Sequence, residues 1–146
     1  MSKIIRRGFV SISAAAALAM LLPMAAIAQS HPAKSKAVFQ VSDGDSQKWN
    51  LTLNNAKNVQ DDLGSDTVDL EIVVYGPGIG MLKGDSPVAK RIADALKSGV
   101  KVVACENTMK AQKLVYADML PAIGYVPAGV VELIKKQQEG YAYIRP

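Results

Sequence analysis

Two hydrophobic periods alternate along this chain, and the alternation predicts strands separated by helices. Short β-rich runs, such as residues 37–41 and 68–75, are in part continuously apolar, as buried parallel strands are. Between them, apolar residues recur at helical spacing, and Ser, Asp, Gly and Pro mark the ends. The expected strands are residues 37–41, 68–75, 101–105, 125–126 and 141–144, and the expected helices are residues 47–63, 87–98, 108–115 and 127–139.

Each expected helix has one apolar face that would pack against the sheet. Ser86 and Pro87 predict the start of the second helix, as its N-cap and its first helical residue. The apolar faces are Trp49, Leu53, Ala56 and Leu63 with Val59 at the edge; Val88, Ile92, Ala95 and Leu96; Met109, Ala111, Leu114 and Val115; and Val130, Val131, Leu133 and Ile134.

The order of these elements is βαβαβαβαβ, which favours an α/β fold with a parallel sheet and helices on both faces. Residues 37–146 are enough for one domain with its own core. Four apolar residues near loops, Met81, Leu82, Met119 and Leu120, are compatible with a subunit interface and equally with core packing.

Residues 1–28 have the pattern of a cleaved secretory signal peptide. Lys3, Arg6 and Arg7 precede an Ala-rich apolar run, and residues 26–28 form an A-x-A cleavage pattern. A retained membrane anchor is the alternative, and the export route, general or twin-arginine, stays open. We expect a periplasmic or secreted protein, with residues 29–36 as a flexible N-terminus.

The charge balance of the remaining chain is nearly neutral. The whole sequence carries a formal net charge of +4, but without the three basic leader residues 14 basic residues face 13 acidic ones. No basic patch with interleaved aromatic residues is present, so a nucleic-acid partner is not expected. No apolar run after residue 28 is long enough to cross a bilayer.

Cys105 is the most informative residue, because it is the only cysteine and follows a buried strand at the start of a helix. Ligands of open α/β sheets bind at the carboxyl ends of strands, and a helix N-terminus favours thiolate over thiol. A small buried hydrophobic side chain is the competing interpretation. One cysteine and one tail histidine, His31, cannot by themselves build a zinc site, and no cofactor motif is complete, so neither metal nor cofactor is expected.

Other residues are expected at the same edge of the sheet. Gly76 and Gly78 follow the second strand, but the loop lacks the third glycine of a dinucleotide fingerprint, so a tight loop is favoured over a phosphate site. Asp43 and Asp45 follow the first strand, where helix capping explains them better than a cation. The expected binding residues around Cys105 are Asp43, Gly76, Gly78, Asn107, Thr108 and Pro127.

The chain resembles the DsrE/DsrF-like family over nearly all of the expected mature protein. The most specific segments are residues 73–78 (VVYGPG), 104–109 (ACENTM) and 125–130 (YVPAGV). The resemblance implies a three-layer α/β/α fold with a five-stranded sheet, and assembly into homotrimers or homohexamers. It also implies that Cys105 is the position at which sulfur-relay relatives carry a persulfide.

Three functions stay open at this level. The first is sulfur handling, in which a Cys105 thiolate takes sulfane sulfur from a donor and passes it to an acceptor. The second is a non-catalytic module that binds a small molecule or anion, with Cys105 in the wall of its pocket. The third is an oligomeric structural protein.

Overall fold

Five parallel strands form the centre of residues 33–146, the part of the chain that the computed structural model describes. Their order across the sheet is β4-β3-β2-β1-β5, so the chain starts near one edge and crosses over between strands. The strands are β1 (Ser35–Val41), β2 (Val68–Val74), β3 (Lys101–Cys105), β4 (Gly124–Val126) and β5 (Ala142–Ile144).

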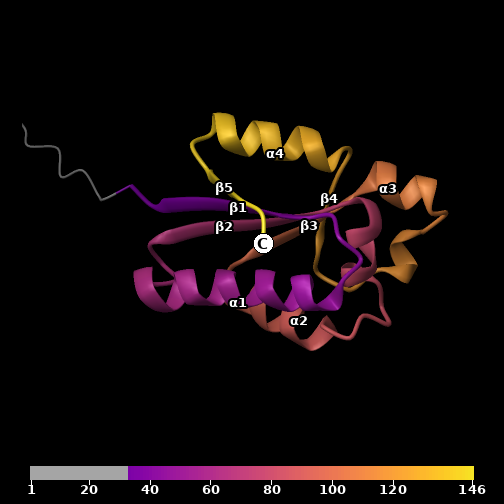
Figure 1. Cartoon of the computed structure of the whole chain (residues 1–146), viewed down its shortest axis with the longest axis horizontal. Helices are drawn as coiled ribbons and strands as arrows, with labels where there is room; N and C mark the ends of the chain where they lie inside the picture. The colour runs from indigo at the N-terminus through magenta and orange to yellow at the C-terminus, as the bar shows by residue number, and fades with distance from the viewer. Residues whose placement is uncertain (1–32) are drawn as a thin grey trace, which may run out of the picture. The chain divides into compact units, whose positions relative to one another are not determined.

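Helices cover both faces of this sheet, which confirms the predicted three-layer α/β/α fold. Figure 1 shows α1 and α2 on one face, α4 on the other, and α3 beyond the end of β3. The helices are α1 (Ser46–Leu63), α2 (Ala89–Lys97), α3 (Glu106–Ala111) and α4 (Gly129–Gln138), with two 3₁₀ helices, η1 (Gly76–Leu82) and η2 (Tyr116–Asp118).

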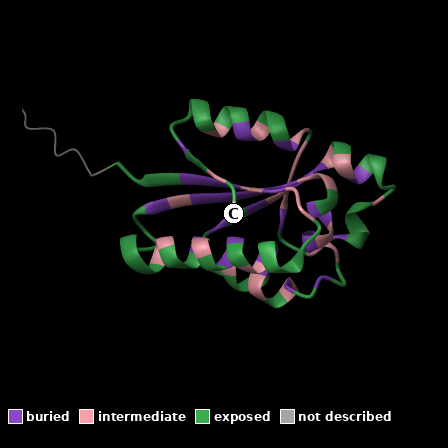
Figure 2. Ribbon diagram, in the orientation of Figure 1, coloured by how far each residue is buried: buried purple, intermediate pink, exposed green. Residues whose placement is uncertain are grey.

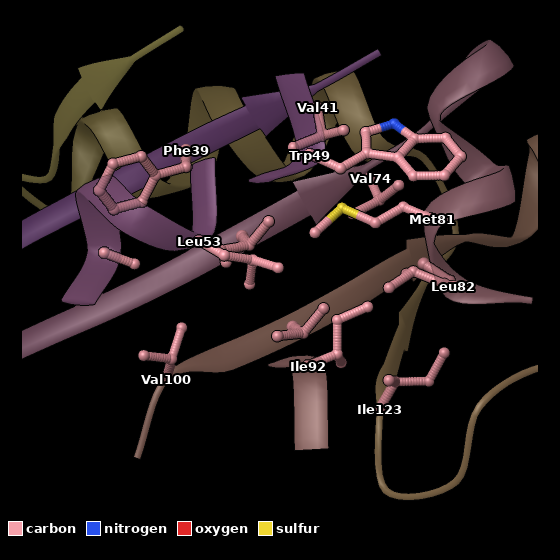
Figure 3. Packing of buried hydrophobic residues seen from close by; sticks show 14 of the residues in the cluster. Phe39, Val41, Trp49, Leu53, Val74, Met81, Leu82, Ile92, Val100 and Ile123 are labelled. Atoms are coloured by element: carbon pink, nitrogen blue, oxygen red, sulfur yellow. The ribbon is translucent and has the colours of Figure 1, made fainter. Parts of the chain in front are cut away.

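The two faces of the sheet have cores of very different size. The large core lies under α1 and α2, and Figure 3 shows Trp49, Val74 and Met81 gathered at one end of it. The core under α4 consists of the buried residues Val38, Val73, Leu133 and Tyr141, with the partly buried Tyr75 and Val103 packed against them. Met81, Leu82 and Met119 belong to the large core, so within this chain these three residues pack internally.

The apolar face of α1 is as predicted except at its end. Trp49, Leu53 and Ala56 are buried, and Val59 packs at the edge of the core. Leu63 was expected on the same face but is 53% exposed, because it is the last residue of α1.

The predicted inner face of α4 is wrong for three of its four residues. Leu133 is buried, but Val130, Val131 and Ile134 are exposed, and Figure 2 shows the outer side of α4 in green. The least exposed residues of α4 are Gly129, Glu132, Leu133 and Lys136, which recur at helical spacing along one face. The buried carboxyl of Glu71 lies beneath them, and Lys136 pairs with it, so a charged contact determined which face turned inward.

Four helix boundaries also differ from the prediction by two or more residues, and one of them is the start of α4, which lies at Gly129 rather than at Pro127. Helix α2 begins at Ala89, because Ser86 and Pro87 form a turn in which the Ala89 N–H donates to the Ser86 carbonyl at 3.1 Å. Helix α3 begins at Glu106 and ends at Ala111, since Lys113 adopts a left-handed conformation with φ of 57°. Val115, expected on the inner face of that helix, is therefore exposed.

Strand β1 begins two residues before the predicted position. Ser35 of β1 pairs with Val68 of β2, so residues 35 and 36 belong to the sheet. The predicted signal peptide over residues 1–28, and residues 29–32 of the expected flexible N-terminus, lie outside the described residues. Within residues 33–146, no helix combines the length and apolar character needed to cross a membrane.

Glu71 is the one charged residue buried in the sheet among the residues described. Its side chain is 4% exposed, its Oε2 lies 3.5 Å from the Lys136 ammonium, and its Oε1 has no hydrogen-bond partner. Burial raises the pKa of this carboxyl, and Lys136 offsets only part of that effect. Folding therefore holds a proton on Glu71 more tightly than the unfolded chain does.

We predict that Glu71→Gln changes the pH dependence of stability. In the wild type, the contribution of Glu71 is present below its ordinary pKa of 4.5 and is lost as the pH rises through the higher folded-state pKa. The variant lacks this loss, so its free energy of unfolding relative to that of wild type should increase from pH 4 to pH 8. Urea unfolding at these two pH values measures the difference, and a difference that does not change with pH would contradict it.

Candidate functional site

Cys105 stands at the carboxyl end of β3 and is the residue immediately before α3. The parallel register places it beside Val126 of β4 on one side. On the other side, the pairing of Ala104 with Val74 places Tyr75 next to it. Its side chain is 5% exposed, so the thiol lies just beneath the surface at the edge where ligands of parallel sheets bind.

Several hydrogen-bond donors lie near the Cys105 sulfur and lower the pKa of its thiol. They are the hydroxyl of Thr108 and the backbone N–H groups of Gly129, Thr108 and Asn107. Asn107 also donates its N–H to the Pro127 carbonyl at 3.2 Å, so its contribution is shared. The donors come from the first turns of α3 and α4, where N–H groups have no partner within the helix.

These donors favour the thiolate. Burial by itself raises the pKa of the Cys105 thiol, because it removes the anion from water, but the hydrogen bonds from Thr108, Gly129 and Asn107 outweigh it. The resulting pKa lies below the ordinary value for cysteine. Cys105 is therefore buried, as the competing interpretation expected, and surrounded by polar donors, as a nucleophile or anion carrier requires.

Thr108 is oriented by the loop after β2. The Gly76 N–H donates to the Thr108 hydroxyl oxygen at 2.9 Å, which leaves the hydroxyl proton for the Cys105 sulfur. Gln112 donates its side-chain amide to the Gly76 carbonyl at 3.3 Å and fastens the same loop to α3. Gly76 itself has φ of 54°, a conformation that glycine adopts without strain.

Gly78 and Asp43 lie farther from the thiol, at the ends of other strands. A Cβ atom on Gly78 would lie 2.7 Å from the Val41 carbonyl oxygen, so this glycine allows η1 to pack on the end of β1. The Asp43 carbonyl accepts the Trp49 indole N–H at 2.7 Å, and its carboxylate lies 4.0 Å from Arg145. The structure thus gathers Gly76, Asn107, Thr108 and Pro127 around Cys105, but not Gly78 or Asp43.

The carboxylate of Asp45 accepts the Gln47 N–H at 2.8 Å and so caps α1.

Gly129 is the residue of this site that sequence reasoning missed. Its N–H is among the groups that lower the pKa of the Cys105 thiol, and a Cβ atom there would lie 3.0 Å from Cδ1 of Tyr75. The absence of a side chain therefore lets the first turn of α4 approach both Tyr75 and Cys105. A glycine two residues after Pro127, at the start of a helix, was the available signal.

A second group of contacts, separate from those of Cys105, surrounds the Glu106 side chain at the start of α3. The Tyr116 hydroxyl donates to its carboxylate, and the Tyr116 ring meets Tyr125 edge-to-face with centroids 4.5 Å apart. A shallow groove of about 200 Å³ lies here, and a larger one of about 410 Å³ lies between α1 and α2. Cys105 lines neither groove. Residues 33–146 contain no cluster of His, Cys, Asp and Glu suited to holding a metal ion.

Comparison with known proteins gives one family and several similar folds. The profile of the DsrE/DsrF-like family matches residues 35–146. A structure of a protein of unknown function, MTH1491 from Methanobacterium thermoautotrophicum, is 32% identical, covers 77% of this chain and 100% of its own, and has a TM-score of 0.74.

Two more distant structures share the fold alone. BT1422, a conserved protein of unknown function from Bacteroides thetaiotaomicron, is 15% identical over 77% of this chain and 95% of its own, with a TM-score of 0.63. The YchN protein from E. coli is 13% identical over 78% of this chain and 99% of its own, with a TM-score of 0.59. No functionally curated protein matches the sequence.

We predict that Thr108→Val raises the pKa of Cys105 by about one unit, because valine has nearly the same shape but cannot donate a hydrogen bond to the thiolate. Thr108→Ser keeps the hydroxyl and should leave the pKa close to that of wild type. Because the chain has a single cysteine, ¹³C-NMR of a Cβ-labelled sample titrates this thiol alone. Equal pKa values in wild type and Thr108→Val would show that the hydroxyl does not stabilise the thiolate.

Proposed function

The chain belongs to the DsrE/DsrF-like family, and from the donors around its only cysteine we propose that it carries sulfane sulfur as a persulfide on Cys105. The observation that supports this most directly is the convergence of the Thr108 hydroxyl and the Gly129 N–H on one sulfur atom. Such a site favours an anionic sulfur without requiring a metal or a positively charged side chain.

The loading step is a nucleophilic exchange at sulfur. The Cys105 thiolate attacks the outer sulfur of a donor such as thiosulfate, and a new S–S bond forms as the old one breaks. Sulfite leaves with the electron pair of the broken bond, and Cys105 is left as Cys–S–S⁻. An acceptor thiolate then attacks the outer sulfur and restores the Cys105 thiolate, so the cycle needs no net oxidant.

The position of the thiol suits a carrier. Cys105 is 5% exposed, which limits its contact with oxidants that would convert a thiolate to sulfenic and sulfinic acids. The same donors are placed to stabilise the thiolate that is released when the sulfur is handed on. Access for a donor then requires a local opening near the first turns of α3 and α4.

Export of the protein is a second part of this proposal. A basic start, an Ala-rich apolar run and the A-x-A pattern at residues 26–28 support cleavage of a signal peptide and a periplasmic or secreted location. Sulfur handling would then take place outside the cytoplasm.

The protein should gain one sulfur atom on incubation with thiosulfate or polysulfide. Intact mass spectrometry should detect an addition of about 32 Da that reducing agent removes. Cys105→Ala should gain nothing, and it is the matched control because alanine also fits a small buried position. No adduct on wild type, combined with slow alkylation of the native thiol, would refute the carrier function and leave a non-catalytic module that binds a small anion or molecule.

Self-association is supported by the outer face of α4. Val130, Val131 and Ile134 are each about half exposed and lie on consecutive turns of one helix. Aliphatic side chains grouped on a helix surface are typical of an interaction site. We propose that this face, defined by these three residues, contributes to a homotrimer or homohexamer.

Ile134→Lys should lower the assembly state, since it places a charge in the middle of the α4 face. Leu51→Lys on α1 is the matched control. Leu51 is 46% exposed and Ile134 is 50% exposed, and their helices, α1 and α4, lie on opposite faces of the sheet (Figure 1). Sedimentation velocity should show smaller particles for the α4 variant only. A wild-type monomer, or equal effects of both substitutions, would contradict the proposed interface.

A further inference from the structure

Helix α4 connects the thiol to a buried charge cluster at its other end. Gly129, its first residue, packs its backbone against Tyr75, the neighbour of Cys105 across the sheet, and its N–H helps to lower the pKa of the Cys105 thiol. Lys136, seven residues later, forms an ion pair with Glu71 of β2. Because an α-helix rises about 1.5 Å per residue, the two contacts lie about 10 Å apart along one rigid element.

Few apolar contacts hold α4 on the sheet. Leu133 is the only residue of this helix in the small core beneath it, and the outer aliphatic residues Val130, Val131 and Ile134 do not contribute to docking on the sheet. The position of α4 within the chain therefore depends unusually strongly on its polar contacts.

Lys136 makes the ion pair that joins α4 to the sheet, with Glu71 of β2, whereas its pairs with Glu132 and Glu139 stay within α4 and its C-terminal end. Its ammonium lies 3.5 Å from Glu71, 3.6 Å from Glu132 and 3.2 Å from Glu139, and its side chain is 13% exposed. The ammonium also lies 5.1 Å from the centroid of the Tyr141 ring. The other charged groups around the cluster are Asp69 of β2, which pairs with Lys101 of β3 and accepts the Tyr141 hydroxyl, and Lys36 of β1, which lies over the same ring.

The opposite end of α4 tolerates little displacement. The Gly129 backbone is packed so closely on Tyr75 that an added Cβ would lie 3.0 Å from the ring. Hydrogen bonds weaken steeply with poor angles and longer distances, so a small tilt or shift of α4 would weaken the Gly129 donor.

We propose that Lys136 is a positioning residue for Cys105: its pairing with Glu71 fixes α4 on the sheet and thereby holds the Gly129 N–H on the thiol. The role extends the proposed function, since it concerns the same cysteine. It is nevertheless measured without a sulfur donor, so failure of persulfide loading and failure of this coupling are separate results.

The test compares the acidity of Cys105 in a Lys136→Met/Glu71→Gln double variant and in wild type. Removing both charges avoids leaving Glu71 buried without its cation, which would endanger the fold. The thiol pKa, measured by ¹³C-NMR of the single cysteine, should rise by about one unit, so that thiolate-dependent alkylation near pH 7 slows about tenfold.

Two single variants separate this effect from a general loss of stability. Lys135→Met removes an exposed charge from the same helix and should leave the thiol pKa unchanged. Glu71→Gln alone removes the same ion pair from its other end while Lys136 stays in place, so it should raise the thiol pKa in the same direction as the double variant. An unchanged thiol pKa in a folded double variant would overturn the proposal.

A measurement on wild type keeps the proposal testable if the double variant does not fold. Titration of Cys105 should move the amide resonance of Gly129 and also that of Lys136, because the helix responds as one body. If Thr108 reports the titration while Gly129 does not, the contact of α4 with the thiol is absent and the proposal fails.

Discussion

The grouping of hydrogen-bond donors around the Cys105 sulfur is the feature that depends on most of the other elements of this structure. It requires β3 to lie between β2 and β4, so that the Gly76 loop approaches Cys105 from one side and the start of α4 from the other. It also requires Thr108 to lie in the first turn of α3, with its hydroxyl oriented by the Gly76 N–H. A parallel sheet brings these segments together because all its strands end at the same edge.

The unequal packing of the two sheet faces gives this site its particular character. Under α1 and α2, a large apolar core makes the sheet a rigid platform that holds the backbone of β3 in place. Under α4, four buried apolar residues and the partly buried Tyr75 and Val103 share the face with the charged cluster of Glu71 and Lys136. A helix docked through charges can respond to substitution or ionisation more readily than a helix docked through a large apolar core, and this helix supplies a donor to the thiol.

Part of the candidate site could be predicted from residue order, and part could not. Cys105, Gly76, Thr108 and Pro127 follow strands, and the carboxyl ends of parallel strands meet, so their proximity was predictable. Gly129 was missed because its role is a backbone N–H, which every residue except proline has. Asp43 was expected at the thiol because it follows β1, but β2 separates β1 from β3 in the sheet, and strand order is not written in local patterns.

The apolar residues of α4 show where local pattern stops being sufficient. The periodicity of α4 favours an inward face made of Val130, Val131, Leu133 and Ile134. Three of these residues are nevertheless exposed, because the sheet beneath α4 contains the buried carboxyl of Glu71, which pairs with Lys136. The sequence by itself determined the α/β class, the position of the strands and the placement of the only cysteine at a strand end. These depend on short-range periodicity and turn chemistry. Only the tertiary structure decided strand order, the inward face of α4 and the acidity of the thiol, because each depends on contacts between residues far apart in the chain.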